Sequence, residues 1–411
     1  MGGPALTPVD VAIAQLLAAA DSAPTAPQPG ATLDALGRVL AQDLHAPFDQ
    51  PAADNSAVDG YAVRSQKVET GRPLPVSQRI AAGDAALPLT PGTVARIFTG
   101  APLPAGADAV VMQEDAQPAA EGMRFTAAPR PGANVRRRGH EIAAGSLLLP
   151  AGTRLRPQEL GLIASAGLAQ IPLFRPLRVA LLSTGRELLE PGQDEAAQLA
   201  SGARLFNSNR YTLTGLLRGL GCQIDDFGIV DDTLAATRTA LQRAAAVADL
   251  LITTGGASVG EEDHLISAIQ QLGRLTLWQL AIKPGKPFAF GEVGTTPIMA
   301  LPGNPAAVLV TFCILCRPYL LRRQGVREVA PLRVRLPAGF SVSQPGKRRE
   351  YLRARLLRDA AGHDRLEPHP NQGSGVLRSA AWADGLAVVE PGQRVAPGDL
   401  IDFHPFAALL G

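Results

Sequence analysis

The residues best suited to chemistry in this sequence are carboxylates and lysines that follow short apolar runs. Glu187 follows LRVALLST, Asp232 follows CQIDDFGIV, and Asp263 lies beyond ADLLITTGG. Lys283 and Lys286 lie on the turn KPGKP, where the prolines stiffen the backbone and hold two cations toward a phosphate. Carboxylate oxygens are the ligands that Mg²⁺ prefers. Together these residues predict a metal-assisted site for a phosphorylated ligand.

A glycine-rich segment, TTGGASVG at 253–260, leaves the apolar run ADLLI and enters a predicted helix. Glycines let backbone amides approach an anion closely, and the start of a helix adds a favourable dipole. A tight strand-to-helix turn is the alternative, but the added serine and aspartate favour a phosphate loop. The residues that we expect to contact the ligand here are Thr254, Gly255, Gly256, Ser258 and Gly260.

Two further loops are candidates for the site. In LPGNP, at 301–305, Pro302 and its neighbours restrict the backbone so that the loop can shape a pocket. Asn304 is also explained by helix capping alone. The segment DNSAVDGYA, at 54–62, contains Asp59 and reads by default as a turn. Nothing in its residues alone brings it to the other motifs.

The elements that must position these residues form a multidomain α/β protein. In 178–327, apolar strands alternate with helices, which predicts a parallel sheet covered on both faces. Ligands bind outside the carboxyl ends of such strands, where most of the candidates lie. Residues 1–46 and 141–177 are expected to form a connecting helical and extended domain, with helices at 9–20 and 34–44. Short strands predict a small β domain at 47–140 and a C-terminal β barrel at 328–411.

Composition limits the class of protein. A chain of 411 residues is long enough for several cores, and a net charge of +2 argues against a nucleic-acid coat. The three cysteines do not form a disulfide framework, and Cys313 and Cys316 lie in an apolar run that predicts buried thiols. With no signal peptide, and an apolar run at 306–316 too short to span a bilayer, we expect a cytoplasmic protein without a membrane partner.

Several motifs together resemble the molybdopterin molybdenumtransferase family, which includes the MoeA proteins and the E domain of gephyrin. The resemblance covers essentially the whole chain, and the order of the motifs makes it specific. The matching segments are DNSAVDGYA, IFTGAPLPAGADAVVMQED, RRRGHEI, LLSTGREL, TTGGASVGEED, IKPGKPFAFG, LPGNPAA and NQGSGVL.

The resemblance implies four subdomains and an elongated homodimer, with an active cleft between the α/β domain of one subunit and the small β domain of the other. This would explain how Asp59 joins the distant carboxylates. The implied substrates are adenylylated molybdopterin and molybdate, used with Mg²⁺ to give AMP and the molybdenum cofactor. The implied partners are a molybdopterin adenylyltransferase and the molybdoenzymes that accept the cofactor.

Residue by residue, the positions that match the family's catalytic set are Asp59, Glu187, Asp232, Asp263 and Lys283, with Asp231 as the alternative to Asp232. The resemblance implies that Glu187, Asp232 and Asp263 hold Mg²⁺, and that Lys283, Lys286 and the glycine-rich loop hold phosphate. It also implies oxyanion contacts from Thr99, Gly100 and the arginines 136–138, and a contribution from Ser374.

Three positions depart from the family pattern. Arg186 stands where members often have an acid, His140-Glu141 replaces an acidic pair, and Gln279 replaces a lysine found in some members. These departures leave open a diverged molybdopterin-binding paralogue, a scaffold or a tungstate-specific transferase. Amidases and adenylyltransferases with a related α/β domain are further alternatives, but the amidases lack the DNSAVDGYA segment and the adenylyltransferases are stand-alone α/β domains.

Overall fold

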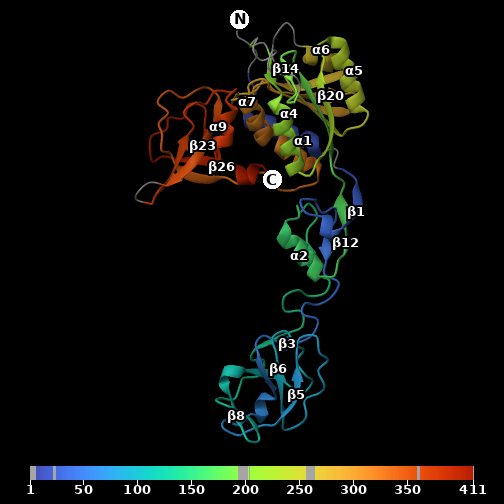
Figure 1. Ribbon diagram of the computed structural model, residues 1–411, viewed down its shortest axis with the longest axis vertical. Coiled ribbons are helices and arrows are strands. Elements are labelled where there is room, and N and C mark those ends of the chain that lie inside the picture. The colour runs from blue at the N-terminus through green and yellow to red at the C-terminus, as the bar shows by residue number, and fades with distance from the viewer. Residues whose placement is uncertain are drawn as a thin grey trace.

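The computed structural model describes residues 6–21, 25–192, 202, 204–255, 264–358 and 362–410. Its chain is elongated, with a small β domain at one end and two sheet domains together at the other (Figure 1). A narrower connecting region joins the ends. The motifs that were predicted to form one site therefore lie at opposite ends of the elongated molecule.

The central sheet has the strand order β16-β13-β17-β21-β20-β18. Its strands are β13 (Arg178–Thr184), β16 (Gln223–Val230), β17 (Leu250–Thr254), β18 (Gly273–Trp278), β20 (Ala289–Val293) and β21 (Thr296–Leu301). Strands β16, β13, β17 and β21 pair in parallel, as the sequence predicts. Strand β20 pairs antiparallel with both β21 and β18, which the sequence pattern did not predict. A turn of two residues joins β20 to β21, and so short a connection permits only antiparallel pairing.

Both faces of this sheet are covered. In β13, Val179 and Leu181 point into one hydrophobic core, whereas Ala180 and Leu182 point into another. The alternation follows from the period of two of a strand. Helices α4 (Ser208–Gly219), α7 (Pro305–Thr311) and α8 (Arg317–Arg323) supply the first core, and α5 (Leu234–Ala245) and α6 (His264–Leu272) supply the second.

The segment between α7 and α8 is a π-helical turn, η4 (Phe312–Cys316), and it is fully buried. Cys313 and Cys316 are free thiols inside it, as predicted, and burial raises the pKa of Cys313 to about 12. The continuous helix Pro305–Arg323 is long and apolar enough to cross a membrane, but 89% of its apolar window is buried inside the protein. Its apolar surface is therefore used by the core.

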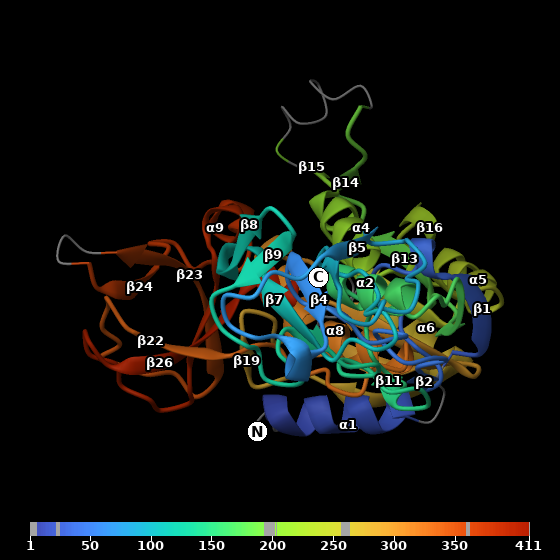
Figure 2. The same ribbon diagram turned by 90° about the horizontal axis from the view of Figure 1, so that it is seen from below.

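The N-terminal segment divides between two parts of the fold. Helix α1 (Val9–Asp21) places Val9, Ala12 and Leu16 in the same core as α8, and it lies along the lower edge of the view in Figure 2. Its main contacts are with α8 and the segment that precedes it, whereas the sequence pattern had placed this helix in the connecting region.

The helix expected at 34–44 is wrong. The chain there forms only the turn η1 (Thr32–Asp34), an isolated bridge at each of Val39 and Leu40, and β2 (Leu44–His45). Gly37 has φ +74°, and the Leu40 N–H donates to the carbonyl of Thr153. The backbone is thus paired with a neighbouring segment rather than with its own helix.

The connecting region is built from short antiparallel pairs around a small core. Strand β1 (Pro27–Ala31) pairs with β12 (Gln170–Phe174), and β2 pairs with β11 (Leu147–Leu149). Helix α2 (Pro157–Ser165) begins at Pro157 and buries Ile163. These contacts join residues that lie more than 100 positions apart in the sequence.

The small β domain has a sheet of order β5-β6-β4-β7, with two strand pairs beside it. Its strands are β3 (Asn55–Ser56), β4 (Gly60–Val63), β5 (Val76–Ile80), β6 (Val94–Ile97), β7 (Ala109–Met112), β8 (Ala116–Ala119), β9 (Gly122–Phe125) and β10 (Val135–Arg136), and its 3₁₀ turns are η2 (Ser65–Lys67) and η3 (Gln113–Asp115).

The C-terminal domain is one curved sheet of order β19-β23-β25-β26-β22, with β24 beside β23. A parallel bridge between Ala338 and Leu366 brings the end of β22 to β24, so the sheet bends back on itself. The elements are β19 (Ile282–Lys283), β22 (Val334–Pro337), β23 (Arg349–Arg358), β24 (Asp364–Pro368), α9 (Leu377–Trp382), β25 (Gly385–Val389), β26 (Leu400–Pro405) and α10 (Phe406–Leu409). Strand β19 comes from the α/β segment, which ties the two domains together.

Candidate active site

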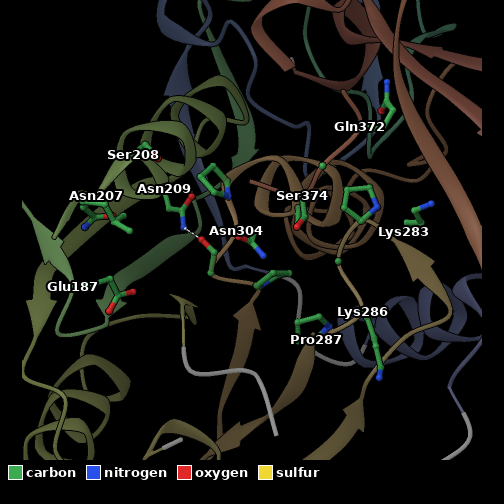
Figure 3. Close-up of a pocket in the computed structure, with 18 of the residues that line it drawn as sticks. Glu187, Asn207, Ser208, Asn209, Lys283, Lys286, Pro287, Asn304, Gln372 and Ser374 are labelled. Atoms are coloured by element: carbon green, nitrogen blue, oxygen red, sulfur yellow. Dashed lines mark hydrogen bonds between the residues drawn. The ribbon is translucent and has the colours of Figure 1, made fainter. Parts of the chain in front are cut away.

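A pocket of about 600 Å³ lies where the α/β domain meets the C-terminal domain. Its wall comes from six separate stretches of the chain: 187–188, 205–209, 283–287, 302–307, 348 and 372–374. Six predicted site residues line it, namely Glu187, Lys283, Lys286, Pro302, Asn304 and Ser374. Glu187 lies on the opposite side of the pocket from the two lysines, and Asn304 and Ser374 lie between them (Figure 3).

The acidic side of the pocket begins at the carboxyl end of β13. Gly185 has φ +143°, and a Cβ on it would lie 2.6 Å from both carboxylate oxygens of Glu187. Only glycine leaves room for the carboxylate in this position. The start of α4 forms the next part of the wall, and the Asn207 side chain caps this helix. Helix α4 follows β15 (Leu205–Phe206), which pairs with β14 (Leu188–Leu189).

Asn209 carries an unused acceptor on this wall. Its amide nitrogen donates to the Gly303 carbonyl at 2.8 Å, which fixes the side chain against the LPGNP loop (Figure 3). Its Oδ1 is buried and accepts no hydrogen bond within the described chain. A buried acceptor without a partner costs free energy, so a ligand donor or cation at this oxygen would be favoured.

The basic side of the pocket contains Lys283, Lys286 and Arg348. The Lys283 ammonium contacts both carboxylate oxygens of Glu350, at 3.1 and 3.0 Å. The Arg348 guanidinium donates to the Ile282 carbonyl at 3.2 Å. Three cations on one wall suit a phosphate or another multiply charged oxyanion.

A buried arginine supports the loop that carries Ser374. Arg353 is 1% exposed, and its guanidinium donates to the Gly373 carbonyl at 3.1 Å and to the Ser379 hydroxyl at 3.0 Å. Burial lowers the pKa of Arg353 to about 10. The Ser374 carbonyl accepts from the Ala306 N–H at 2.9 Å, which joins this loop to the start of α7.

The described start of the glycine-rich loop lies at the same edge of the sheet. Gly255 ends β17 with φ +85°, and its Cα lies 3.8 Å from where a Cβ of Gly303 would be. Thr254 is buried. Gly256, Ser258, Gly260 and Asp263 lie outside the described residues.

Asp232 follows β16 and does not line the pocket. Its carboxylate lies 3.9 Å from the Arg186 guanidinium. Over the described ranges no cluster of three His, Cys, Asp or Glu side chains is placed to hold a metal ion. Glu187 and Asp232 are carboxylates that follow the neighbouring strands β13 and β16.

Asp59 lies in the small β domain, at the far end of the chain from this pocket (Figure 1). Its carboxylate accepts from the Thr99 N–H at 2.8 Å and from the Thr99 hydroxyl at 2.7 Å. The backbone hydrogen bond, followed by the hydroxyl, lowers the pKa of Asp59. Asp59, Thr99 and Gly100 thus form one corner, which a single chain does not bring to Lys283.

Two arginines of the predicted cluster form ion pairs with aspartates of the same region. Arg137 pairs with Asp54 at 2.5 Å, and Arg138 pairs with Asp49 at 2.5 Å. These ion pairs hold the junction between the small β domain and the connecting region, which gives the two arginines a structural role.

The sequence analysis missed the pocket residues Asn207, Asn209, Arg348, Gln372 and the lysine partner Glu350. The basic run at 347–349 is a signal that the sequence does show. The sequence could not show which residue of the basic run faces the pocket.

Comparisons with known proteins agree with this architecture. Three family models match in order: the MoeA N-terminal region (domain I and II) at 7–167, a probable molybdopterin binding domain at 180–322, and the MoeA C-terminal region (domain IV) at 335–406. A MoeA structure from Pyrococcus horikoshii OT3 is 25% identical, covers 98% of this chain and 100% of that one, and superposes with a TM-score of 0.83.

Curated relatives extend over most of the chain. The molybdopterin molybdenumtransferase of Haemophilus influenzae is 36% identical, over 92% of this chain and 93% of the relative. The one from Nostoc sp. is 35% identical, over 87% and 83%. With this identity, the ordered domain matches and a pocket lined by the family's motifs, the chain belongs to the molybdopterin molybdenumtransferase family.

Proposed function

We propose that this chain inserts molybdate into adenylylated molybdopterin, releasing AMP and giving the molybdenum cofactor. The observation that supports this most is the charge division of the pocket. Lys283, Lys286 and Arg348 provide a wall for phosphate groups, while Glu187 and the free Asn209 oxygen lie on the other side. An anionic ligand with a polar, hydrogen-bonding head suits this division.

Mg²⁺ is the metal that we propose to accompany the substrate, on the chemistry of the donors near the pocket. Glu187 and Asp232 offer carboxylates, and the buried Asn209 Oδ1 offers a neutral oxygen, which are the donors that Mg²⁺ prefers. We propose that Glu187 and Asp232 hold the ion, with Asp263 as the third acid. When bound, Mg²⁺ would neutralise charge on phosphate oxygens.

We propose a homodimer with the cleft shared between subunits. The support is the separation of the Asp59–Thr99 corner from the pocket within one chain (Figure 1). A second copy would bring that corner to the pocket. An adenylyltransferase that supplies the substrate and molybdoenzymes that accept the cofactor are the proposed partners. The three free cysteines suit the cytoplasm as the location.

A diverged paralogue is the second candidate, and one observation favours it. Arg186 places a cation 3.9 Å from the Asp232 carboxylate, and this lowers the attraction of that acid for a metal. Such a protein would bind molybdopterin but insert molybdate poorly, or would prefer tungstate.

The test is a reconstitution assay with purified protein, adenylylated molybdopterin, Mg²⁺ and molybdate. AMP release and activation of a cofactor-free molybdoenzyme, both dependent on molybdate, are the expected results. Ligand binding without either signal would contradict the proposal and support the paralogue. Repeating the assay with tungstate separates the two oxyanions.

The Lys286→Gln variant tests whether the pocket itself binds the phosphate. The change removes one cation from the pocket and should weaken AMP binding about tenfold, as expected for one charged hydrogen bond. The control is Lys347→Gln, which removes the same charge from an exposed residue outside the pocket wall. Equal losses in both variants would show that the pocket does not bind the phosphate.

A further inference from the structure

We infer that Glu350 is an internal counter-ion of the pocket, which occupies Lys283 before an anionic ligand arrives and thereby sets the affinity of the site for anions. The Lys283 ammonium lies 3.1 Å from one carboxylate oxygen of Glu350 and 3.0 Å from the other. Lys283 lines the pocket, and Glu350 does not. This inference rests on the proposed function, in which Lys283 binds phosphate.

The pairing is fixed by backbone register. Strand β19 runs parallel to β23, with Ile282 opposite Arg349 and Lys283 opposite Glu350. The Arg349 N–H also donates to the Ala281 carbonyl at 3.0 Å. The lysine and the glutamate are therefore neighbours whatever the ligand does, so the carboxylate is always available to the ammonium.

The space around Glu350 also holds its carboxylate in place. A Cβ on Gly346 would lie 2.9 Å from Glu350 Oε1, so the chain approaches the carboxylate closely only because residue 346 has no side chain. The Glu350 side chain is 19% exposed, whereas that of Lys283 is 48% exposed. The acid is thus sheltered while the ammonium remains open to a ligand.

The neighbouring basic residues have different partners. Arg349 binds the carboxylates of Asp10 and Glu390, at 2.7 and 2.8 Å, on the side away from the pocket. Arg348 faces the pocket and donates to a carbonyl. Of the three pocket cations, Lys283 is therefore the one with a carboxylate partner in the described chain. An incoming phosphate must share or displace that partner.

The consequence is a gain in anion affinity when the carboxylate is removed. Glu350→Gln keeps the size of the side chain and removes its charge, which frees the ammonium. The expected result is pyrophosphate binding tighter by roughly two- to fivefold, the range for one partly exposed ion pair. Loss of folding cannot produce tighter binding, so the sign of the change carries the test.

The experiment titrates inorganic pyrophosphate into the full chain by calorimetry. The matched control is Glu390→Gln, which removes the same charge from the residue that follows β25, where Val389 is the register partner of Glu350. It should leave binding unchanged. Binding to Glu350→Gln that is undetectable, weaker than wild type or no tighter than in the control would overturn the inference.

A double-variant cycle checks that the effect acts through the lysine. In a Lys283→Gln background, the added Glu350→Gln change should no longer tighten binding, because the ammonium that it frees is absent. An equal gain in both backgrounds would refute the counter-ion role. Pyrophosphate binding needs no turnover, so failure of the reconstitution assay would refute the proposed function while leaving this result to stand or fall separately.

Discussion

Gly255→Ala is the change whose effect the structure defines most closely. Gly255 joins the end of β17 to the site, with φ +85°. A Cβ at this position would lie 2.3 Å from the Thr184 carbonyl oxygen and 3.2 Å from its hydroxyl. Thr184 ends the neighbouring strand β13 and is buried, so it cannot move aside without displacing the strand.

The magnitude has two parts. A left-handed backbone costs a residue with a side chain about 1 to 2 kcal/mol. Forcing the strand ends apart adds about 1 to 3 kcal/mol, as overpacking does in a close-packed interior. We therefore expect the free energy of unfolding of the α/β domain to fall by roughly 2 to 5 kcal/mol. Ligand binding should weaken too, because β13 leads to Glu187.

Hydrogen exchange measured by mass spectrometry on peptides from β13 and β17 provides the assay. Faster exchange in these peptides, with unchanged exchange in the small β domain, is expected. Gly303→Ala is the control: its φ is not left-handed, and the nearest atom to its Cβ is 3.8 Å away, an ordinary contact. Wild-type exchange in Gly255→Ala, or equal damage from both changes, would refute the steric argument.

Three further changes test the C-terminal domain and the small β domain. Arg353→Met should lower the stability of the C-terminal domain by about 2 to 4 kcal/mol in urea unfolding, since the buried Ser379 hydroxyl and the Gly373 carbonyl lose their donor; an unchanged midpoint would count against it. The hydrogen bond from the Arg138 N–H is the largest cause that lowers the pKa of Asp54 below its usual 3.8. The ionised Asp54 carboxylate therefore stabilises the fold above pH 3.8, and this stabilisation is lost as the pH falls through the pKa of Asp54 in the folded protein. Protease cleavage at this junction should therefore rise in acid in wild type but not in Asp54→Asn, and identical pH profiles would contradict this. Gly60→Ala would place a Cβ 1.9 Å from the Val111 carbonyl oxygen, so limited proteolysis should find the small β domain unfolded, whereas an intact domain would show that β4 and β7 can separate.

The sequence by itself determined the family, the order of the domains and most of the strands and helices of the α/β segment. Apolar runs such as 178–184 alternate with amphipathic helices. This pattern involves only neighbouring residues, so it can be recognised from the sequence alone. The site loops were also visible, because KPGKP and LPGNP combine chemical side chains with residues that restrict the backbone. Lys283, Lys286, Pro302 and Asn304, all predicted from these two motifs, line the pocket.

Local patterns failed where partners are distant in the sequence. The segment 34–44 has apolar residues at helical spacing, yet its backbone pairs with residues more than 100 positions away. Helix α1 packs on α8 for the same kind of reason, since an apolar helix face does not specify which surface covers it.

The tertiary structure alone decided which charges face each other across the pocket. A basic run at 347–349 does not reveal that Arg348 faces the pocket, that Arg349 holds Asp10, or that the next residue, Glu350, holds Lys283. These partners are set by the register of β19 against β23, which joins positions 67 residues apart. Pairing of this kind depends on how two domains dock, and docking is a property of the packed chain rather than of any one segment.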